Sequence, residues 1–358
     1  MDKYHIDGHK LYWHMDRVLQ WQKDRVVSPI YVEVSPASFC NHRCIFCGID
    51  FARDKGLQLN ADILCKRIEE MGKTGVKSIM FAGEGEPLLH KDMPAFVMTA
   101  KENGIDVSIT TNGSLGSYAL WKEILPFLTW IRFSVDAGTA DVHATVHKVS
   151  EDAFYKTVKS IDEAVRVKRE LGLNVTIGIQ FLVIKENIDT MEEAVRLFSG
   201  IGVDYFSLKP YSLHPQMINK RDTEYTDNLI RHIEEIVDKY KDNSSKMNII
   251  FRKSAMEKYR DKDRIFRHCR ALPFWGYISS KGDFYTCSVF INDERFRTGN
   301  IYEDDMEHIF FGDKRKQSIK YGEKDLPIAE ECRLNCRMAR INEFLGFLER
   351  RPEHINFI

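Results

Sequence analysis

Three features are missing from this 358-residue sequence, and each absence excludes a class of protein. Positive charge is not in excess, because 52 lysines and arginines face 53 aspartates and glutamates. A nucleic-acid-binding surface normally needs such an excess, so no nucleic-acid partner is expected. No apolar run approaches the roughly 18 residues of a membrane span, and residues 1–10 show no signal-peptide pattern. We therefore expect a cytoplasmic protein without membrane contact.

Short apolar strands alternate with amphipathic helical stretches over much of the chain. Strands are expected at 30–35, 78–82, 106–111, 130–135, 175–183 and 204–209, and helices at 60–73, 91–103, 117–126, 151–171 and 186–199. Strands separated by single helices pair in parallel with right-handed crossovers. The sequence thus predicts an α/β fold, a partial (β/α)6 TIM-like barrel with its chemistry at the carboxyl ends of the strands.

The pattern changes in the last third of the chain. A long polar helix is expected at 222–242, and residues 274–290 resemble a β-hairpin that turns at Lys281-Gly282-Asp283. The expected regions are a helical extension (1–29), the barrel (30–240), a small α+β domain (241–340) and a helical tail (341–358).

The eight cysteines are grouped rather than scattered. Cys40, Cys44 and Cys47 form a C-x3-C-x2-C motif after the first strand. In a long chain without a signal peptide, such a group indicates metal binding or catalysis. Zinc usually takes four protein ligands, and His42 is the nearest further donor. Three thiolates on a 4Fe–4S cluster would leave one iron open, and this reading is favoured over zinc.

A second group of cysteines lies near the C-terminus. Its four members are Cys269, Cys287, Cys332 and Cys336. Four thiolates can close an iron–sulfur cluster or a structural zinc site, and spacing alone does not decide between them. Cys65 stands apart on a predicted helix, where a small buried apolar role is expected.

The first motif, after the first strand of a partial barrel, resembles that of the radical S-adenosylmethionine (SAM) enzymes. Gly83-Glu84-Gly85-Glu86-Pro87, at the end of the second strand, looks like the Gly-Gly-Glu-Pro motif of that family, with Glu84 in place of the first glycine. By this resemblance its backbone meets the methionyl amino group of SAM. Four further SAM contacts are expected at later strand ends, namely Asn112, Ser134, Asp136 and Gln180. Turn, helix-cap or interior roles are the alternatives for Asn112, Asp136 and Gln180.

The resemblance implies a chemistry and its cofactors. A 4Fe–4S cluster on Cys40, Cys44 and Cys47 would donate an electron to SAM, giving a 5′-deoxyadenosyl radical that removes hydrogen from a substrate. Flavodoxin or ferredoxin would be a suitable electron donor. The second cysteine group resembles the auxiliary-cluster module called twitch, a short form of the SPASM domain. One auxiliary 4Fe–4S cluster is therefore expected.

Three polar residues follow the sixth strand and are the expected substrate residues. Lys209, Tyr211 and His214 would contact a substrate or move a proton, or else belong to a polar surface loop. His143 and His147 form a weaker group, for which a helix-surface role is as reasonable.

The arrangement resembles the butirosin aminocyclitol dehydrogenase and related sugar-modifying members of the family. A small polyhydroxylated substrate is therefore expected, such as a sugar, sugar nucleotide or aminocyclitol. The reaction would be an oxidation or a redox-neutral elimination or decarboxylation. A peptide-modifying maturase is the alternative enzyme, although the stretch before the first strand is too short for a peptide-recognition domain. A non-catalytic iron–sulfur scaffold is the alternative of another class.

Overall fold

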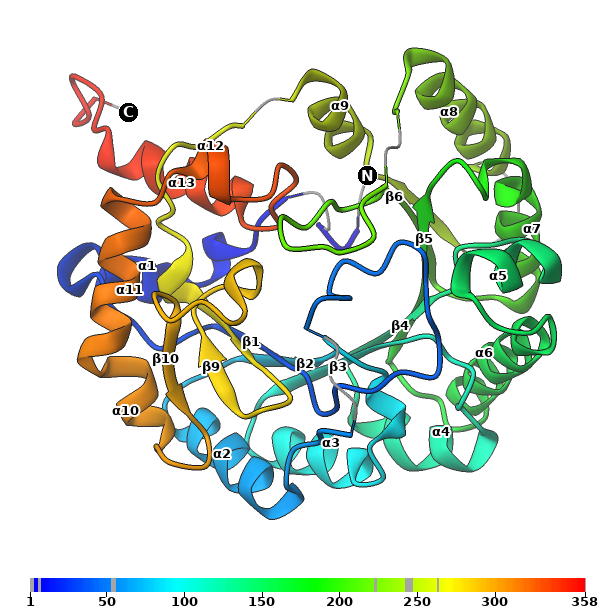
Figure 1. The fold of residues 1–358 in the computed structure, drawn as a ribbon, viewed down its shortest axis with the longest axis horizontal. Helices are drawn as coiled ribbons and strands as arrows, with labels where there is room; N and C mark the ends of the chain where they lie inside the picture. Colours follow the sequence, from blue (N-terminus) through cyan, green and yellow to red (C-terminus); the bar gives the residue numbers. More distant parts are fainter. Residues whose placement is uncertain are drawn as a thin grey trace.

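One continuous sheet organises the computed structural model, which describes residues 3–5, 8–52, 56–221, 224–241, 247–262 and 264–357. Its strands are β1 (Tyr31–Val34), β2 (Ser78–Phe81), β3 (Asp106–Thr111), β4 (Trp130–Ser134), β5 (Thr176–Val183), β6 (Tyr205–Pro210), β7 (Asn248–Phe251), β8 (Trp275–Ile278), β9 (Asp283–Tyr285) and β10 (Arg297–Asn300). The spatial order is β10-β9-β8-β1-β2-β3-β4-β5-β6-β7. The sheet curls into an incomplete ring with helices outside it (Figure 1).

Helices cover the outer face of this sheet. They are α1 (Met15–Asp24), α2 (Ala61–Lys73), α3 (Met93–Glu102), α4 (Tyr118–Ile124), α5 (Ala140–His147), α6 (Asp152–Glu170), α7 (Met191–Ile201), α8 (Asp227–Lys241), α9 (Lys253–Asp261), α10 (Met306–Phe311), α11 (Asp313–Lys324), α12 (Ile328–Glu331) and α13 (Ala339–Glu349). Helix α8 lies within the predicted 222–242 stretch, of which 222–223 and 242 are outside the described residues. Within the described residues, no helix is both long enough and apolar enough to cross a membrane.

The prediction of a partial parallel α/β barrel with a small cluster-binding region is confirmed. Strands β1 to β6 coincide with the six predicted strands, and successive strands pair in parallel. Strands β8 and β9 form the predicted antiparallel hairpin. At its turn, Gly282 has φ +86° and donates its N–H to the carbonyl of Ser279. A positive φ suits glycine, which has no Cβ.

The structure corrects the predicted limits of the barrel. Strand β7 pairs in parallel with β6, so the sheet continues beyond the predicted barrel end at residue 240. On the other side β8 pairs in parallel with β1, which joins the C-terminal hairpin to the same sheet. Helices α5 and α9 are also missing from the prediction. The barrel and the C-terminal region therefore share one sheet.

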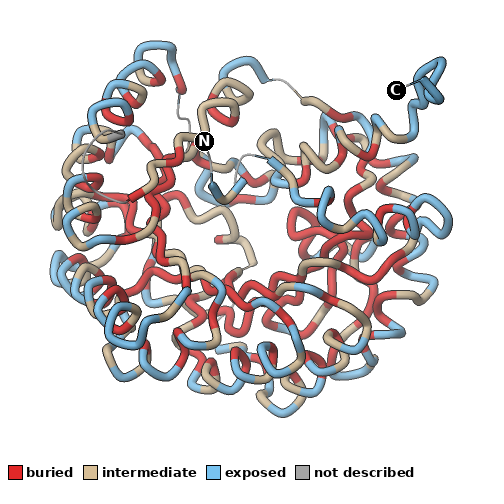
Figure 2. The backbone as a smooth tube through the Cα atoms, turned by 180° about the vertical axis from the view of Figure 1, so that it is seen from behind, coloured by how far each residue is buried: buried red, intermediate tan, exposed pale blue. Residues whose placement is uncertain are grey.

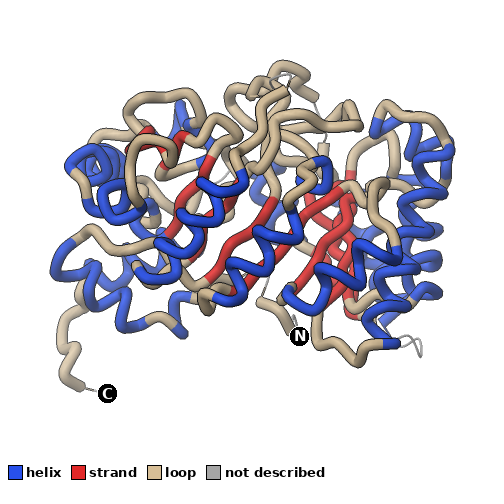
Figure 3. Tube along the Cα trace, turned by 90° about the horizontal axis from the view of Figure 1, so that it is seen from below, coloured by secondary structure: helices blue, strands red, loops and turns tan. Residues whose placement is uncertain are grey.

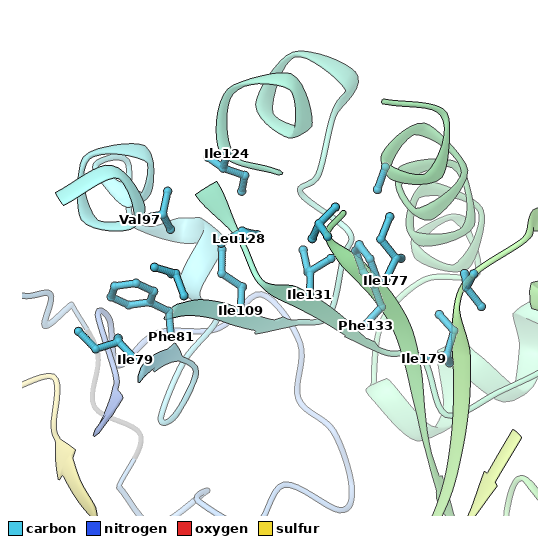
Figure 4. Packing of buried hydrophobic residues seen from close by; sticks show 14 of the residues in the cluster. Ile79, Phe81, Val97, Ile109, Ile124, Leu128, Ile131, Phe133, Ile177 and Ile179 are labelled. Atoms are coloured by element: carbon cyan, nitrogen blue, oxygen red, sulfur yellow. The ribbon is translucent and has the colours of Figure 1, made fainter. Parts of the chain in front are cut away.

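Alternation along the strands separates the core from the barrel interior. Ile79 and Phe81 of β2 and Ile131 and Phe133 of β4 are buried and point toward the surrounding helices, and Val97 of α3 belongs to the same cluster (Figure 4). The intervening residues point into the barrel, since successive strand side chains face opposite sides. Buried residues accordingly follow the strands and the inner helix faces, whereas the outer helix faces are exposed (Figure 2).

Loops gather at one end of the barrel, and both chain termini lie toward the other (Figure 3). The loop after β1 lies over the middle of the ring of strands, drawn in blue in Figure 1. Its backbone bonds to α5, because Arg43 N–H donates to the carbonyl of His147 and Ile45 N–H to that of Val146. The first cysteine motif is therefore held above the carboxyl ends of the strands.

Candidate cluster and cofactor site

The three thiols of the first motif converge in this loop. Cys40, Cys44 and Cys47 interact electrostatically, and all three are half-buried. Burial raises the pKa of Cys40 to about 11, with a further contribution from the Glu86 carboxylate. Binding of a metal cation would stabilise these three partly buried thiols in their thiolate form, because a sulfur that ligates a metal is deprotonated.

A buried histidine, which the sequence offered only as a weaker substrate candidate, adjoins the motif. His147 Nδ1 lies 3.1 Å from Cys44 Sγ, and its Nε2 lies 2.6 Å from the carbonyl oxygen of Val135. His143 and His147 are 0% and 1% exposed, so the helix-surface role considered for them is wrong. Helix α5 was not predicted because its short polar and β-branched residues give no clear helical periodicity. The contact between Cys44 and His147 spans 103 positions, so the order of the sequence does not reveal it.

The same histidine creates a second possible donor set. Ligand atoms of His42, Cys44 and His147 lie within 4.8 Å of one another, which suits zinc as well as iron. Cys44 can serve only one of the two sets. We assign it to the set with Cys40 and Cys47, because the C-x3-C-x2-C motif supplies three thiols within eight residues of the same loop.

Glycines let the cysteine loop approach the end of β2 closely. A Cβ on Gly85 would lie 2.2 Å from the carbonyl oxygen of Phe39 and 2.6 Å from that of Ala37. Gly83 has φ +112°. The Glu86 carboxylate accepts hydrogen bonds from Thr111 Oγ1, at 2.6 Å, and from the N–H of Asn112, at 2.8 Å. The Glu86 side chain therefore joins the ends of β2 and β3, whereas the expected SAM contact was that of the motif's backbone.

Glu84, the residue that departs from the family motif, faces the C-terminal hairpin. Its buried carboxylate accepts from the Tyr277 hydroxyl at 3.2 Å, from the Ser280 N–H at 3.3 Å and from the Ser280 hydroxyl. Burial raises the pKa of Glu84, and these donors oppose the shift. The expected SAM contact is thus not made by this side chain, which ties the β2 end to the β8–β9 turn.

Removing this carboxylate is expected to destabilise the protein. Glu84→Ala leaves the Tyr277 hydroxyl and the Ser280 N–H without their acceptor, at a cost of about 2 kcal/mol for unpaired buried donors. Thermal unfolding of the reconstituted protein should show a lower midpoint, with a smaller shift for the isosteric Glu84→Gln. Unchanged stability together with lost SAM binding would instead make Glu84 a SAM ligand.

Two orphaned polar atoms mark a ligand site at the ends of β4 and β5. Asp136, in a left-handed conformation with φ +52°, accepts from the Leu182 N–H through Oδ1. Its Oδ2 has no hydrogen-bond partner among the described residues, although His147 Nε2 lies 3.6 Å away. Gln180 Oε1 is likewise buried without a partner there. Burial raises the pKa of Asp136 to about 7. Ser134 ends β4 beside Gln180, its register partner.

Such orphaned atoms fit a polar cofactor, since buried polar groups normally find partners. SAM, with its amino acid and ribose groups, could use Ser134, Asp136 and Gln180, and these residues fit the predicted contacts. Asn112 has a different environment, because its amide donates to Asn41 Oδ1 at 2.8 Å and its Oδ1 accepts from Ser114. Through its hydrogen bond to Asn41, the Asn112 side chain connects the end of β3 to the cysteine loop.

The three residues expected to contact substrate are separated by the fold. Lys209 lines the barrel interior. Tyr211 is buried, bonds to Met217 through its hydroxyl and packs in a cluster with Ile45. His214 donates to the carbonyl of Ser288 at 3.3 Å, near Cys287. Tyr211 and His214 therefore connect the loop after β6 to its neighbours, and only Lys209 keeps a place in the cavity.

The second cysteine group also assembles. Cys269 precedes β8, Cys287 follows β9, and Cys332 and Cys336 lie before α13. Cys269, Cys287 and Cys332 belong to one buried cluster, and Cys336 packs against it. Burial and the neighbouring thiols raise the pKa of Cys287 to about 12. Four converging thiols fit a fully ligated auxiliary iron–sulfur cluster.

Two regions of the chain match described families. Residues 34–198 match the radical SAM superfamily, and residues 269–337 match an iron–sulfur cluster-binding domain, SPASM. The chain is 29% identical over 197 residues to the tungsten-containing aldehyde ferredoxin oxidoreductase cofactor-modifying protein of Pyrococcus furiosus. The matched region covers 53% of each of the two chains. It is 31% identical over 189 residues to the GTP 3′,8-cyclase of Chlorobaculum tepidum, covering 51% of this chain and 55% of that one. The chain thus spans about half the length of these curated relatives.

Solved structures extend the likeness to nearly the whole chain. Streptococcus suis SuiB bound to precursor peptide SuiA has a TM-score of 0.68 at 18% identity, covering 95% of this chain and 78% of SuiB. Native anSMEcpe with bound AdoMet and Cp18Cys peptide has a TM-score of 0.58 at 17% identity, covering 88% of both chains. At these identities the likeness concerns the fold, a partial barrel followed by a cluster-binding region.

Proposed function

We propose that this chain, a radical SAM enzyme with a C-terminal SPASM domain, modifies a peptide. The likeness to SuiB in complex with its precursor peptide carries the proposal, because it covers 95% of the chain, including the C-terminal region. The likeness to the GTP cyclase covers 51%. The expected sugar or aminocyclitol substrate has no counterpart among the relatives named above. The peptide alternative is therefore better supported than the sugar reading.

The residues at the carboxyl ends of the strands would have two different roles, binding of the cluster and binding of SAM. Cys40, Cys44 and Cys47 would hold the cluster, and Ser134 and Gln180 lie where SAM would be bound. Cluster and SAM together supply one-electron chemistry that removes a hydrogen atom from an unreactive carbon. The protein contributes orientation and exclusion of water, for which the loop after β1 covers the middle of the barrel (Figure 1).

The size of the barrel cavity suits part of a peptide. Its volume is about 600 Å³, which falls within the usual range of about 300–1,000 Å³ for ligand sites. That space holds a few side chains and not a folded protein. A peptide would place its reacting residue inside and leave the remainder on the rim.

A comparison of substrate classes tests this proposal. The anaerobically reconstituted protein, with SAM and dithionite, is offered a synthetic library of 12-residue peptides, a panel of sugars and aminocyclitols, or GTP. We expect the library alone to raise 5′-deoxyadenosine formation above the uncoupled rate and to yield peptides of changed mass. Turnover of a sugar, an aminocyclitol or GTP, with every peptide unchanged, would contradict the proposal.

A further inference from the structure

The lining of the barrel cavity is positively charged. Residues from β1, β2, β4, β5 and β6 form its wall, together with a C-terminal segment at 333–337 and N-terminal residues such as Tyr4. Tyr4 and Tyr205 pack with ring centroids 5.4 Å apart at the end away from the cysteine loop. Among the described lining residues there is no aspartate or glutamate, whereas six lysine and arginine side chains from several parts of the chain contribute, namely Lys10, Arg132, Lys209, Arg252, Arg333 and Arg337.

Two of these arginines have a buried nitrogen atom without a hydrogen-bond partner among the described residues. Arg337 pairs with Glu33 at 2.6 Å. Arg132 donates to Thr110 Oγ1 at 3.1 Å, but its Nε is buried without a partner in the described part of the chain. The Nε of Arg333 is in the same situation. Each of these Nε–H groups can donate to a bound acceptor. Such binding is favourable because a buried polar group without a hydrogen bond costs free energy.

The basic groups act on one another across the cavity. Burial lowers the pKa of Lys209, and Arg132, Arg252 and Arg337 lower it further, while Asp136 opposes them. Mutual repulsion of this kind is relieved when an anion enters. A cavity lined by charge of one sign also concentrates ligands of the opposite sign.

We infer that the cavity binds the carboxylates of an acidic segment of the peptide substrate, an inference that rests on the proposed function. Arginine forks bind carboxylates and phosphates alike, through paired N–H donors. The arrangement of the donors favours carboxylates. Polyphosphates are usually cradled by backbone N–H groups of a glycine-rich loop or a helix N-terminus. Here the cations are side chains from β4, from β6 and from segments outside the strands, and Gly8 is the one glycine of the described lining.

Calorimetry on the reconstituted protein tests this inference. The probes are N-acetylated hexaglutamate amide and its hexaglutamine counterpart, titrated anaerobically with SAM at saturation so that the carboxylate of SAM has already found its own site. We expect hexaglutamate to bind at least about ten-fold more tightly, a difference of about 1.4 kcal/mol. Arg132→Gln and Lys209→Met should each remove most of that preference. Arg231→Gln, on the exposed face of α8, is the matched control.

Four results would overturn the inference. Equal binding of both peptides by the wild type would show that the cavity does not select anions. A preference that survives both cavity substitutions would place the anion elsewhere. Displacement of hexaglutamate by GTP at far lower concentration would assign the cavity to a nucleotide. Modification of peptides from the library without any preference for acidic ones would contradict this inference alone, whereas hexaglutamate binding with no peptide modified would contradict the proposed function.

Discussion

Alanine in place of Cys40, Cys44 and Cys47 will abolish reductive cleavage of SAM and remove about four of about eight irons, the number in two 4Fe–4S clusters. The three thiols interact in one loop, and removing them leaves no thiolate there to hold iron. Anaerobic reconstitution, iron analysis and chromatography of 5′-deoxyadenosine measure both effects.

The matched control for this variant is Cys65→Ala. Cys65 is half-buried on α2, packed against the main core and apart from both cysteine groups, so its loss should leave iron content and SAM cleavage unchanged. The triple variant must also keep the circular dichroism of the wild type. Formation of 5′-deoxyadenosine by a folded triple variant would show that the motif does not hold the reactive cluster.

Cys287→Ala will have the second large effect, on metal content and on stability together. Cys287 lies between β9 and the segment that carries Cys332 and Cys336, in a buried cluster with Cys269. A metal cluster that joins these distant segments contributes its binding free energy to folding. The variant should lose about four irons, and the midpoint of thermal unfolding should fall by several degrees.

The control for Cys287→Ala separates ligation from packing. Cys287→Ser keeps the volume of the side chain but is a poor cluster ligand, so it should lose iron as the alanine variant does. Removing the metal from the wild type with a chelator should lower the unfolding midpoint to a similar value. Full iron content in both variants would remove Cys287 from the ligand set.

Much of the barrel could be predicted because its signals are local. Stretches of four to eight residues rich in β-branched and aromatic side chains mark β1 to β6. The Asn60 side chain caps α2 by accepting a hydrogen bond from the Ile63 N–H. Strand β7 has four residues and follows a long polar helix, so its sequence does not indicate that it extends the sheet. The parallel pairing of β8 with β1 depends on contacts between the two ends of the chain.

The metal ligands of the site could be predicted, because the spacing of the cysteines in the sequence indicates them. The contacts of other side chains could not, because they depend on the direction in which each side chain points. Both cysteine groups follow from the sequence. The motif assigned the backbone at Glu84 and Glu86 to SAM but did not predict their carboxylate contacts with Ser280 and Asn112, which depend on tertiary structure. The signal for Arg132 was present, since it alternates with the buried, helix-facing Phe133 on β4 and so had to face the barrel interior.

Metal analysis of the wild-type protein, with SAM cleavage measured on the same sample, tests the central claim most directly. A radical SAM enzyme with one auxiliary cluster should contain about eight irons and about eight sulfides per chain, without zinc, and should form 5′-deoxyadenosine when reduced. Zinc bound at His42, Cys44 and His147, with no 5′-deoxyadenosine formed, would contradict the claim.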